Sequence, residues 1–255
     1  MVELATLAEL YTHYLWVFLR ISALWMALPV FGSGVLSTRL RLVLGVSCTI
    51  LIGSMLPEVI PPPLWSAAWW LAIVQEIALG VLMAFTLALV FEMIRLAAEV
   101  IGMAMGLGFA QMTDPLNGLS APVLGQYFSI LAILLFLAGG GHLAVVQWLA
   151  MSLIDLPPGR WVMDSGQVMI PVVWASNVFA GALQVALPAL VALLLMNLSF
   201  GVISRAAPSL NLFAIGFPAS LILGLVMVMV TLPLLQTHFT RGIEAAFEQI
   251  ALFGG

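Results

Sequence analysis

The sequence predicts an all-α, multi-pass membrane protein, and three observations lead to that fold class. Of the 255 residues, 64% are hydrophobic and only 7% are charged, whereas soluble domains are about 45–50% apolar and about 25% charged. The mean hydropathy is +1.21. Long uncharged stretches separate most of the charges. So little polar surface cannot cover a water-soluble globule, and a soluble fold is therefore excluded.

About six long helices account for the uncharged stretches. A spanning helix needs about 20 apolar residues, and a charge at the bilayer centre costs about 2.5–3.5 kcal/mol on insertion scales. Helices placed between the charges and the turn-forming residues occupy six segments: 11–30, 40–56, 69–95, 124–149, 171–203 and 212–237.

Turn-forming residues separate these segments. Phe31-Gly-Ser-Gly follows the first, a proline-rich stretch from Pro57 follows the second, and Leu156-Pro-Pro-Gly follows the fourth. Gly139-Gly-Gly marks an interruption within the fourth helix. Pro218 is expected to break and kink the sixth helix near its start, because proline cannot donate to the helical hydrogen-bond ladder.

Glu92, Arg95 and Glu99 form the most distinctive group of charges within a predicted span. Their spacing of three and four residues puts them on one face of a helix, where Arg95 can pair with either acid. Intramembrane charges indicate function by default. The group either lines a hydrophilic path or is a neutralised network that seals a contact between proteins.

The segment from Gly106 to Pro122 differs from the helices around it, because glycines, prolines and short polar side chains interrupt it. Irregular backbone at membrane depth must be buried in protein or line an aqueous cavity. The pattern is typical of a substrate site, a gate or a plug, and an ordinary connecting loop is the alternative. The candidate residues are Gly106, Gly108, Phe109, Gln111, Met112, Thr113, Asp114, Pro115, Asn117 and Gly118.

The last third of the chain is expected to form a helical hairpin. Asn197, Gly201 and Arg205 recur every four residues and therefore share a face at the end of the fifth helix. Arg205 complements the negative end of the helix dipole there. The stretch Ala206-Ala-Pro-Ser-Leu-Asn is expected to make the turn, because Pro208 cannot continue the helix.

Several function classes find no support in the sequence. A net charge of −4 does not provide the basic patch that nucleic-acid binding needs. The single Cys48 and the three scattered histidines make neither a disulfide nor a metal site. No catalytic set and no nucleotide-binding G-x-x-x-x-G-K-[ST] loop is present. We therefore expect no enzyme activity, cofactor or metal, and energy for any transport must come from elsewhere.

Four stretches carry a resemblance to a known family. They are Leu28-Pro-Val-Phe-Gly with the later Arg39-Leu-Arg, the run from Gly106 to Pro115, Leu134-Leu-Phe-Leu with Gly141-His, and the run from Asn197 to Pro218. In these stretches the sequence resembles the FliR family. That family comprises the membrane subunits of the flagellar type III protein-export gate and their counterparts in virulence injectisomes.

The resemblance implies an arrangement and a role. Residues 1–165 would be FliP-like, with 106–122 projecting into the channel as its plug, and residues 166–255 would be a FliQ-like hairpin whose turn residues contact partners. FliP-like and FliQ-like subunits, an FlhB-like protein and unfolded export substrates are the implied partners. The implied location is the bacterial inner membrane, within the flagellar basal body.

Two other transport functions stay open at this point. One is an injectisome homologue of the same gate. The other is a small-solute secondary transporter with its substrate at the broken segment. Such transporters usually have two related halves with matching interruptions, and the interruption at 106–122 has no clear counterpart elsewhere in the sequence.

Overall fold

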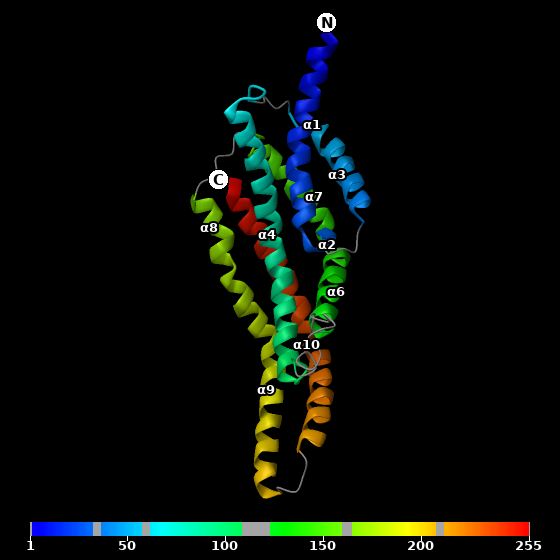
Figure 1. Ribbon diagram of the computed structural model, residues 1–255, viewed down its shortest axis with the longest axis vertical. Coiled ribbons are helices and arrows are strands. Elements are labelled where there is room, and N and C mark those ends of the chain that lie inside the picture. Colours follow the sequence, from blue (N-terminus) through cyan, green and yellow to red (C-terminus); the bar gives the residue numbers. More distant parts are fainter. Residues whose placement is uncertain are drawn as a thin grey trace. The chain divides into compact units, whose positions relative to one another are not determined.

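The computed structural model describes residues 2–32, 37–57, 62–108, 123–159, 165–207 and 212–254 (Figure 1). Within these ranges every regular element is a helix, which confirms the all-α fold class. The helices are α1 (Val2–Ala27), α2 (Pro29–Gly32), α3 (Thr38–Gly53), α4 (Ala67–Ala104), α6 (Val123–Ala138), α7 (Gly141–Asp155), α8 (Ser165–Trp174), α9 (Ser176–Ala206) and α10 (Leu212–Ala251), and a 3₁₀ turn follows at Leu252–Gly254.

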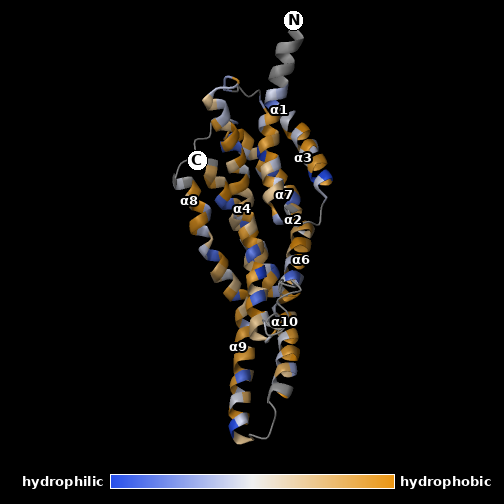
Figure 2. Ribbon diagram, in the orientation of Figure 1, coloured by the Kyte–Doolittle hydropathy of each residue, from blue (hydrophilic) through white to orange (hydrophobic). Residues whose placement is uncertain are grey.

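The helices correspond broadly to the six predicted segments. Among the described residues, three helical stretches are long and apolar enough to cross a bilayer: Ala67–Ala104, Val168–Ala206 and Ile215–Ala251. The α6–α7 pair makes a fourth if it counts as one broken span. Figure 2 shows apolar residues along the length of these helices rather than in one narrow stripe.

Two predicted helix interruptions have different outcomes. The interruption at Gly139-Gly-Gly is confirmed, since α6 and α7 meet there at a bend of 66°. Gly140 has φ +71°, and a Cβ at Gly141 would overlap the ring of Phe136. The predicted break at Pro218 is wrong, because α10 continues through it, and the kink expected there stays a prediction. Neighbouring groups can satisfy the carbonyl that a proline leaves free in a membrane helix.

The described residues form two compact units. Unit 1 comprises residues 1–89, 136–175 and 243–255, and unit 2 comprises 90–135 and 176–242. The helices α4, α6 and α10 contribute to both units. This division by compactness is distinct from the predicted FliP-like and FliQ-like parts, which rest on resemblance and stay a prediction.

Unit 1 is held together where α1 lies closely against its neighbours. Gly80 of α4 lets the backbones approach, because a Cβ there would come within 2.5 Å of the Arg20 carbonyl oxygen. Trp16 of α1, fully buried, meets Trp69 of α4 edge to face at 6.2 Å. His13 Nε2 lies 2.9 Å from the carbonyl oxygen of Gly53 in α3. The close approach at Gly80 and the specific contacts of Trp16 and His13 thus fix the position of α1 against α4 and α3.

Unit 2 uses methionine side chains packed over glycines. Met93 of α4 occupies the place that a side chain at Gly181 of α9 would take, and Met105 does the same at Gly224 of α10. Phe91 and Phe239 add an edge-to-face contact at 5.3 Å between α4 and α10. Flexible thioethers fill such irregular gaps well, so the end of α4 is fixed between α9 and α10.

The neck of the 106–122 segment

The segment from Gly106 leaves α4 through a well-defined helix end. The Leu107 N–H donates to the Gly102 carbonyl and the Gly106 N–H donates to the Met103 carbonyl, each at 3.0 Å. Gly106 has φ +83°. These two bonds and the left-handed glycine make a Schellman motif, which ends a helix by satisfying its last carbonyls. The start predicted for the segment at Gly106 agrees with this helix end.

The chain returns to the same place where α6 begins. A Cβ at Gly102 would lie 3.8 Å from Leu107 Cδ1 and 4.0 Å from Leu124 Cβ, so these three residues converge. Leu124 is buried. We call Gly102, Gly106, Leu107 and Leu124 the neck. The two ends of the segment therefore leave and enter the fold side by side.

Most of the predicted plug residues fall outside the described part of the chain. Gly106 and Gly108 are described, and a Cβ at Gly108 would meet no atom within 4 Å. The others lie in 109–122 and have no description here: Phe109, Gln111, Met112, Thr113, Asp114, Pro115, Asn117 and Gly118. Their role as a plug stays a prediction.

The charge group on α4 forms the ion pairs that its spacing predicts. Arg95 contacts Glu92 with an N–O distance of 2.5 Å and Glu99 with one of 2.7 Å. The Arg95 and Glu92 side chains are each 48% exposed, and that of Glu99 is 25% exposed. With two carboxylates and one guanidinium, the group carries a net charge of −1. It is a hydrophilic, half-exposed patch on an otherwise apolar helix.

This charged patch lies against the first turn of α6, close to the neck. A Cβ at Gly125 would be 3.5 Å from Glu99 Cγ and 3.7 Å from Arg95 Cγ. Glycine at this position lets α6 approach the ion pairs without a side chain between them. Unit 2 thereby brings together the charges and the exit and return of the 106–122 segment, two features that the sequence analysis treated separately.

The turn residues at the end of α9 lie on one exposed face, as their spacing predicts. Asn197, Gly201 and Arg205 are all exposed, and a Cβ at Gly201 would meet no atom within 4 Å. Pro208 lies outside the described residues. An exposed helical face at the end of a hairpin is available to a partner, which remains a prediction.

A second charged cluster, in unit 1, was not predicted. Arg20 of α1 and Glu76 of α4 form an ion pair at 2.7 Å with side chains 0% and 1% exposed. Arg20 also donates to the carbonyl oxygens of Ser152 and Leu156, at 2.7 and 2.8 Å, at the end of α7. The Gly159 N–H donates to the same Glu76 carboxylate.

Every polar hydrogen of the Arg20 guanidinium has a partner in this cluster. Two donate to Glu76, two to the carbonyl and hydroxyl of Ser152, and one to Leu156. The carbonyls at a helix C-terminus have no intrahelical partner, and a positive charge there is favourable. Arg20 therefore joins α1 and α4 and caps α7. The only sequence signal was two opposite charges in apolar segments, separated by 56 residues.

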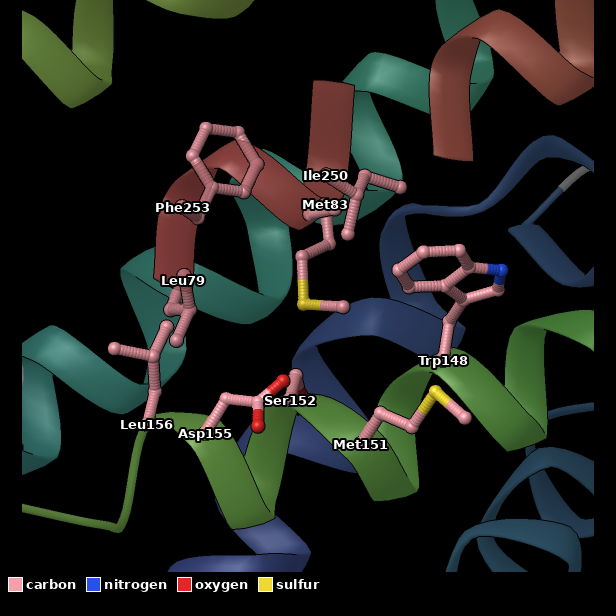
Figure 3. A pocket seen from close by; sticks show the side chains of 10 residues that line it. Leu79, Met83, Trp148, Met151, Ser152, Asp155, Leu156, Ile250 and Phe253 are labelled. Atoms are coloured by element: carbon pink, nitrogen blue, oxygen red, sulfur yellow. The ribbon is translucent and has the colours of Figure 1, made fainter. Parts of the chain in front are cut away.

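A small cavity lies beside this cluster, between α4, α7 and α10 (Figure 3). Its volume is about 50 Å³, and Ser152 and Asp155 are the polar residues among side chains such as Met83, Trp148 and Phe253. Such a volume suits a few water molecules rather than a substrate. Among the described residues, no three His, Cys, Asp or Glu side chains could hold a metal ion.

Comparison with known proteins identifies the family. The model of the family "Bacterial export proteins, family 1" matches residues 11–246. The chain is 35% identical over 240 residues to the flagellar biosynthetic protein FliR of Pectobacterium carotovorum subsp. carotovorum, covering 94% of this chain and 92% of that protein. It is 36% identical to FliR of Escherichia coli (strain K12), covering 93% and 91% of the two chains. Because these matches span nearly the whole sequence, the chain belongs to the FliR family of bacterial flagellar export proteins.

Proposed function

We propose that this protein is an inner-membrane subunit of the flagellar type III export gate, within the basal body, and that residues 106–122 plug its channel. In this proposal it assembles with FliP-like and FliQ-like subunits and an FlhB-like protein around a path for unfolded flagellar subunits. The flagellar names of its relatives favour this system over an injectisome.

The neck is the observation that supports the plug best. A plug must leave the bundle and return to it without pulling the helices apart when it moves. The Schellman end at Gly106 and the approach of both Leu107 and Leu124 to Gly102 place the two ends near one point. Two ends anchored near one point would keep α4 and α6 packed whatever position a plug takes.

The charged patch beside the neck fits a hydrophilic path. Glu92, Arg95 and Glu99 stay partly exposed within unit 2, so they can contact water or a passing polar chain without the cost of burying charge. The exposed face of Asn197, Gly201 and Arg205 is proposed to contact a neighbouring subunit.

Co-expression tests the assembly. We expect the chain made alone to aggregate, because large apolar residues are exposed along α3, α4, α9 and α10. Co-expression with FliP-like and FliQ-like proteins should yield a stable complex that purifies with this chain. A chain that behaves as a stable monomer in detergent would contradict the assembly.

Deletion of residues 111–120 tests the plug within the assembled complex. The deletion should make reconstituted complexes conduct ions in planar bilayers, whereas the intact complex should stay closed. A variant in which glycine and serine replace the same ten residues is the matched control, because it keeps the length and removes the side chains. Unchanged conductance of the deletion variant would remove the plug assignment and leave the family intact.

A further inference from the structure

Met105, the residue just before the left-handed glycine of the neck, packs over a glycine of another helix. A Cβ added at Gly224 of α10 would lie 2.6 Å from both Sδ and Cε of Met105 and would also overlap its Cγ. Met105 is only 1% exposed. Both residues belong to unit 2. The end of α4 therefore fills a space on α10 that only a residue without a side chain leaves open.

The backbone of α10 gives no reason for a glycine at position 224. Gly224 lies inside the helix and is not among the glycines with a positive φ. Glycine is less favourable inside a helix than any residue except proline. Ser220 and Val228, one turn to either side on the same face, are buried and carry side chains. Gly224 thus forms a notch between two larger residues, and the Met105 side chain occupies it.

A similar contact of Met93 with Gly181 of α9 lies at a different kind of position on α4. Met93 is 12 residues before Met105, which is about 18 Å along a helix. The helix continues on both sides of Met93, whereas Met105 follows Ala104, the last residue of α4. The contact at Gly181 therefore acts on a continuous part of α4, and the contact at Gly224 acts on the helix end.

Backbone hydrogen bonds connect Met105 to the neck. The Met105 N–H donates to a carbonyl of α4 at 2.9 Å, and the two bonds of the Schellman motif follow directly. Leu124, where the chain returns, lies beside Gly102 in the same last turn of α4. A side chain that fits between the side chains of a facing helix opposes sliding of the two helices. A displacement of α10 along its axis would therefore be passed through Met105 to both ends of the segment.

We propose that Met105, packed in the notch at Gly224, is the positioning residue of the neck, through which α10 sets where the 106–122 segment leaves and re-enters the fold. Methionine has three rotatable bonds, so its side chain can enter and leave such a notch. For its effect on the channel the proposal rests on the proposed plug, whereas its effect on the neck can be measured separately.

Amide hydrogen exchange tests the effect on the neck, in the complex with the FliP-like and FliQ-like subunits. In Gly224→Ala the added methyl group overlaps Met105, and exchange of the two Schellman amides should rise several-fold as their bonds open. Gly181→Ala is the matched control, because its methyl group overlaps Met93 in the same way and should leave those two amides unchanged. Unchanged exchange in Gly224→Ala, or an equal rise in Gly181→Ala, would overturn the proposal.

Met105→Ala removes the side chain without adding volume, so it decides the question if Gly224→Ala does not assemble. It should raise exchange at the same two amides, whereas its matched control Met93→Ala should not. In the Met105→Ala background, Gly224→Ala should add no further rise, because none of the overlapping atoms remains. Additive effects would show that Gly224 acts on the neck without Met105 and would overturn the proposal.

Ion conductance of reconstituted complexes tests the effect on the channel. Gly224→Ala and Met105→Ala should each conduct more than Gly181→Ala. If they do not, while the deletion of 111–120 does conduct, the neck is not coupled to channel closure and the proposal is overturned. If that deletion does not conduct either, the plug assignment itself fails, and amide exchange alone decides whether Met105 positions the neck.

Discussion

Arg20 and Arg95 both form ion pairs with glutamate, but the first is buried and the second is partly exposed. The Arg20–Glu76 pair in unit 1 is fully buried, and the remaining donors of the guanidinium go to the carbonyls of Ser152 and Leu156 and to the Ser152 hydroxyl. The Arg95 pairs in unit 2 are partly exposed, and among the residues that the structure describes they join side chains of one helix. An exposed pair contributes little to stability, whereas a buried charge without its partner is strongly destabilising. The Arg20 cluster therefore stabilises the fold, whereas the Arg95 group contributes little to stability and is open to a functional role.

The largest effect is expected from Glu76→Ala, which leaves Arg20 buried without its counter-charge. The free energy of unfolding in mixed micelles should fall by about 3–5 kcal/mol. The double variant Arg20→Met with Glu76→Leu is the matched control, since apolar residues can replace a buried ion pair at little cost. A Glu76→Ala protein as stable as the parent would mean that water reaches the cluster.

Arg20→Lys separates the charge of the cluster from its hydrogen bonds. Lysine keeps the positive charge, but it cannot donate to Glu76 with two parallel bonds and also reach the carbonyls of Ser152 and Leu156. The free energy of unfolding should fall by about 2 kcal/mol, the contribution of a hydrogen bond to a charged group. Amide hydrogen exchange at the end of α7 should rise in the same variant. Unchanged exchange there would contradict the capping role of Arg20.

Gly106→Ala extends the comparison to the neck of unit 2. Alanine is disfavoured at φ +83°, and the loss of stability should be about 1–2 kcal/mol. Gly216→Ala is the control, because Gly216 lies inside α10 and a Cβ there would be at ordinary van der Waals distance, 3.9 Å, from Phe200 Cδ2, so alanine should be neutral or slightly stabilising there. Equal effects of the two substitutions would show that the left-handed conformation at Gly106 is not required.

The smallest effect on stability is expected from Arg95→Gln. The unfolding free energy should change by less than about 1 kcal/mol, because the pairs that are lost are partly exposed. Swarming motility, which reports flagellar export, should nevertheless fall if the patch lines the export path. Normal motility together with normal stability would indicate that the charges neither stabilise the fold nor line the export path.

The sequence predicted the features that depend on local spacing. Arg95, Glu92 and Glu99 are three and four residues apart on a helix, and they pair accordingly. Gly106 and Gly139-Gly-Gly interrupt helices because glycine permits a positive φ. The positions of the charged residues also marked the ends of the apolar stretches. These stretches indicated an all-α membrane protein with about six long helices.

Features that depend on distant contacts could not be predicted. The partners of Arg20 come from α4 and from backbone carbonyls of α7, more than 130 residues away, and a backbone carbonyl has no sequence signature. The convergence of Leu107 with Leu124 is equally invisible, since leucine is common throughout the chain. The break expected at Pro218 was wrong because α10 continues through this residue, and a local rule about proline does not account for its tolerance inside membrane helices.

Because of the neck, the length of the 106–122 segment should have little effect on the stability of the packed helices. Because Leu107 and Leu124 both lie beside Gly102, the entropy of closing the loop depends mainly on the number of residues between them. Such a cost rises slowly, by about 0.6 kcal/mol for each doubling of loop length. Residues can therefore be inserted or removed between the two leucines without disturbing α4 and α6.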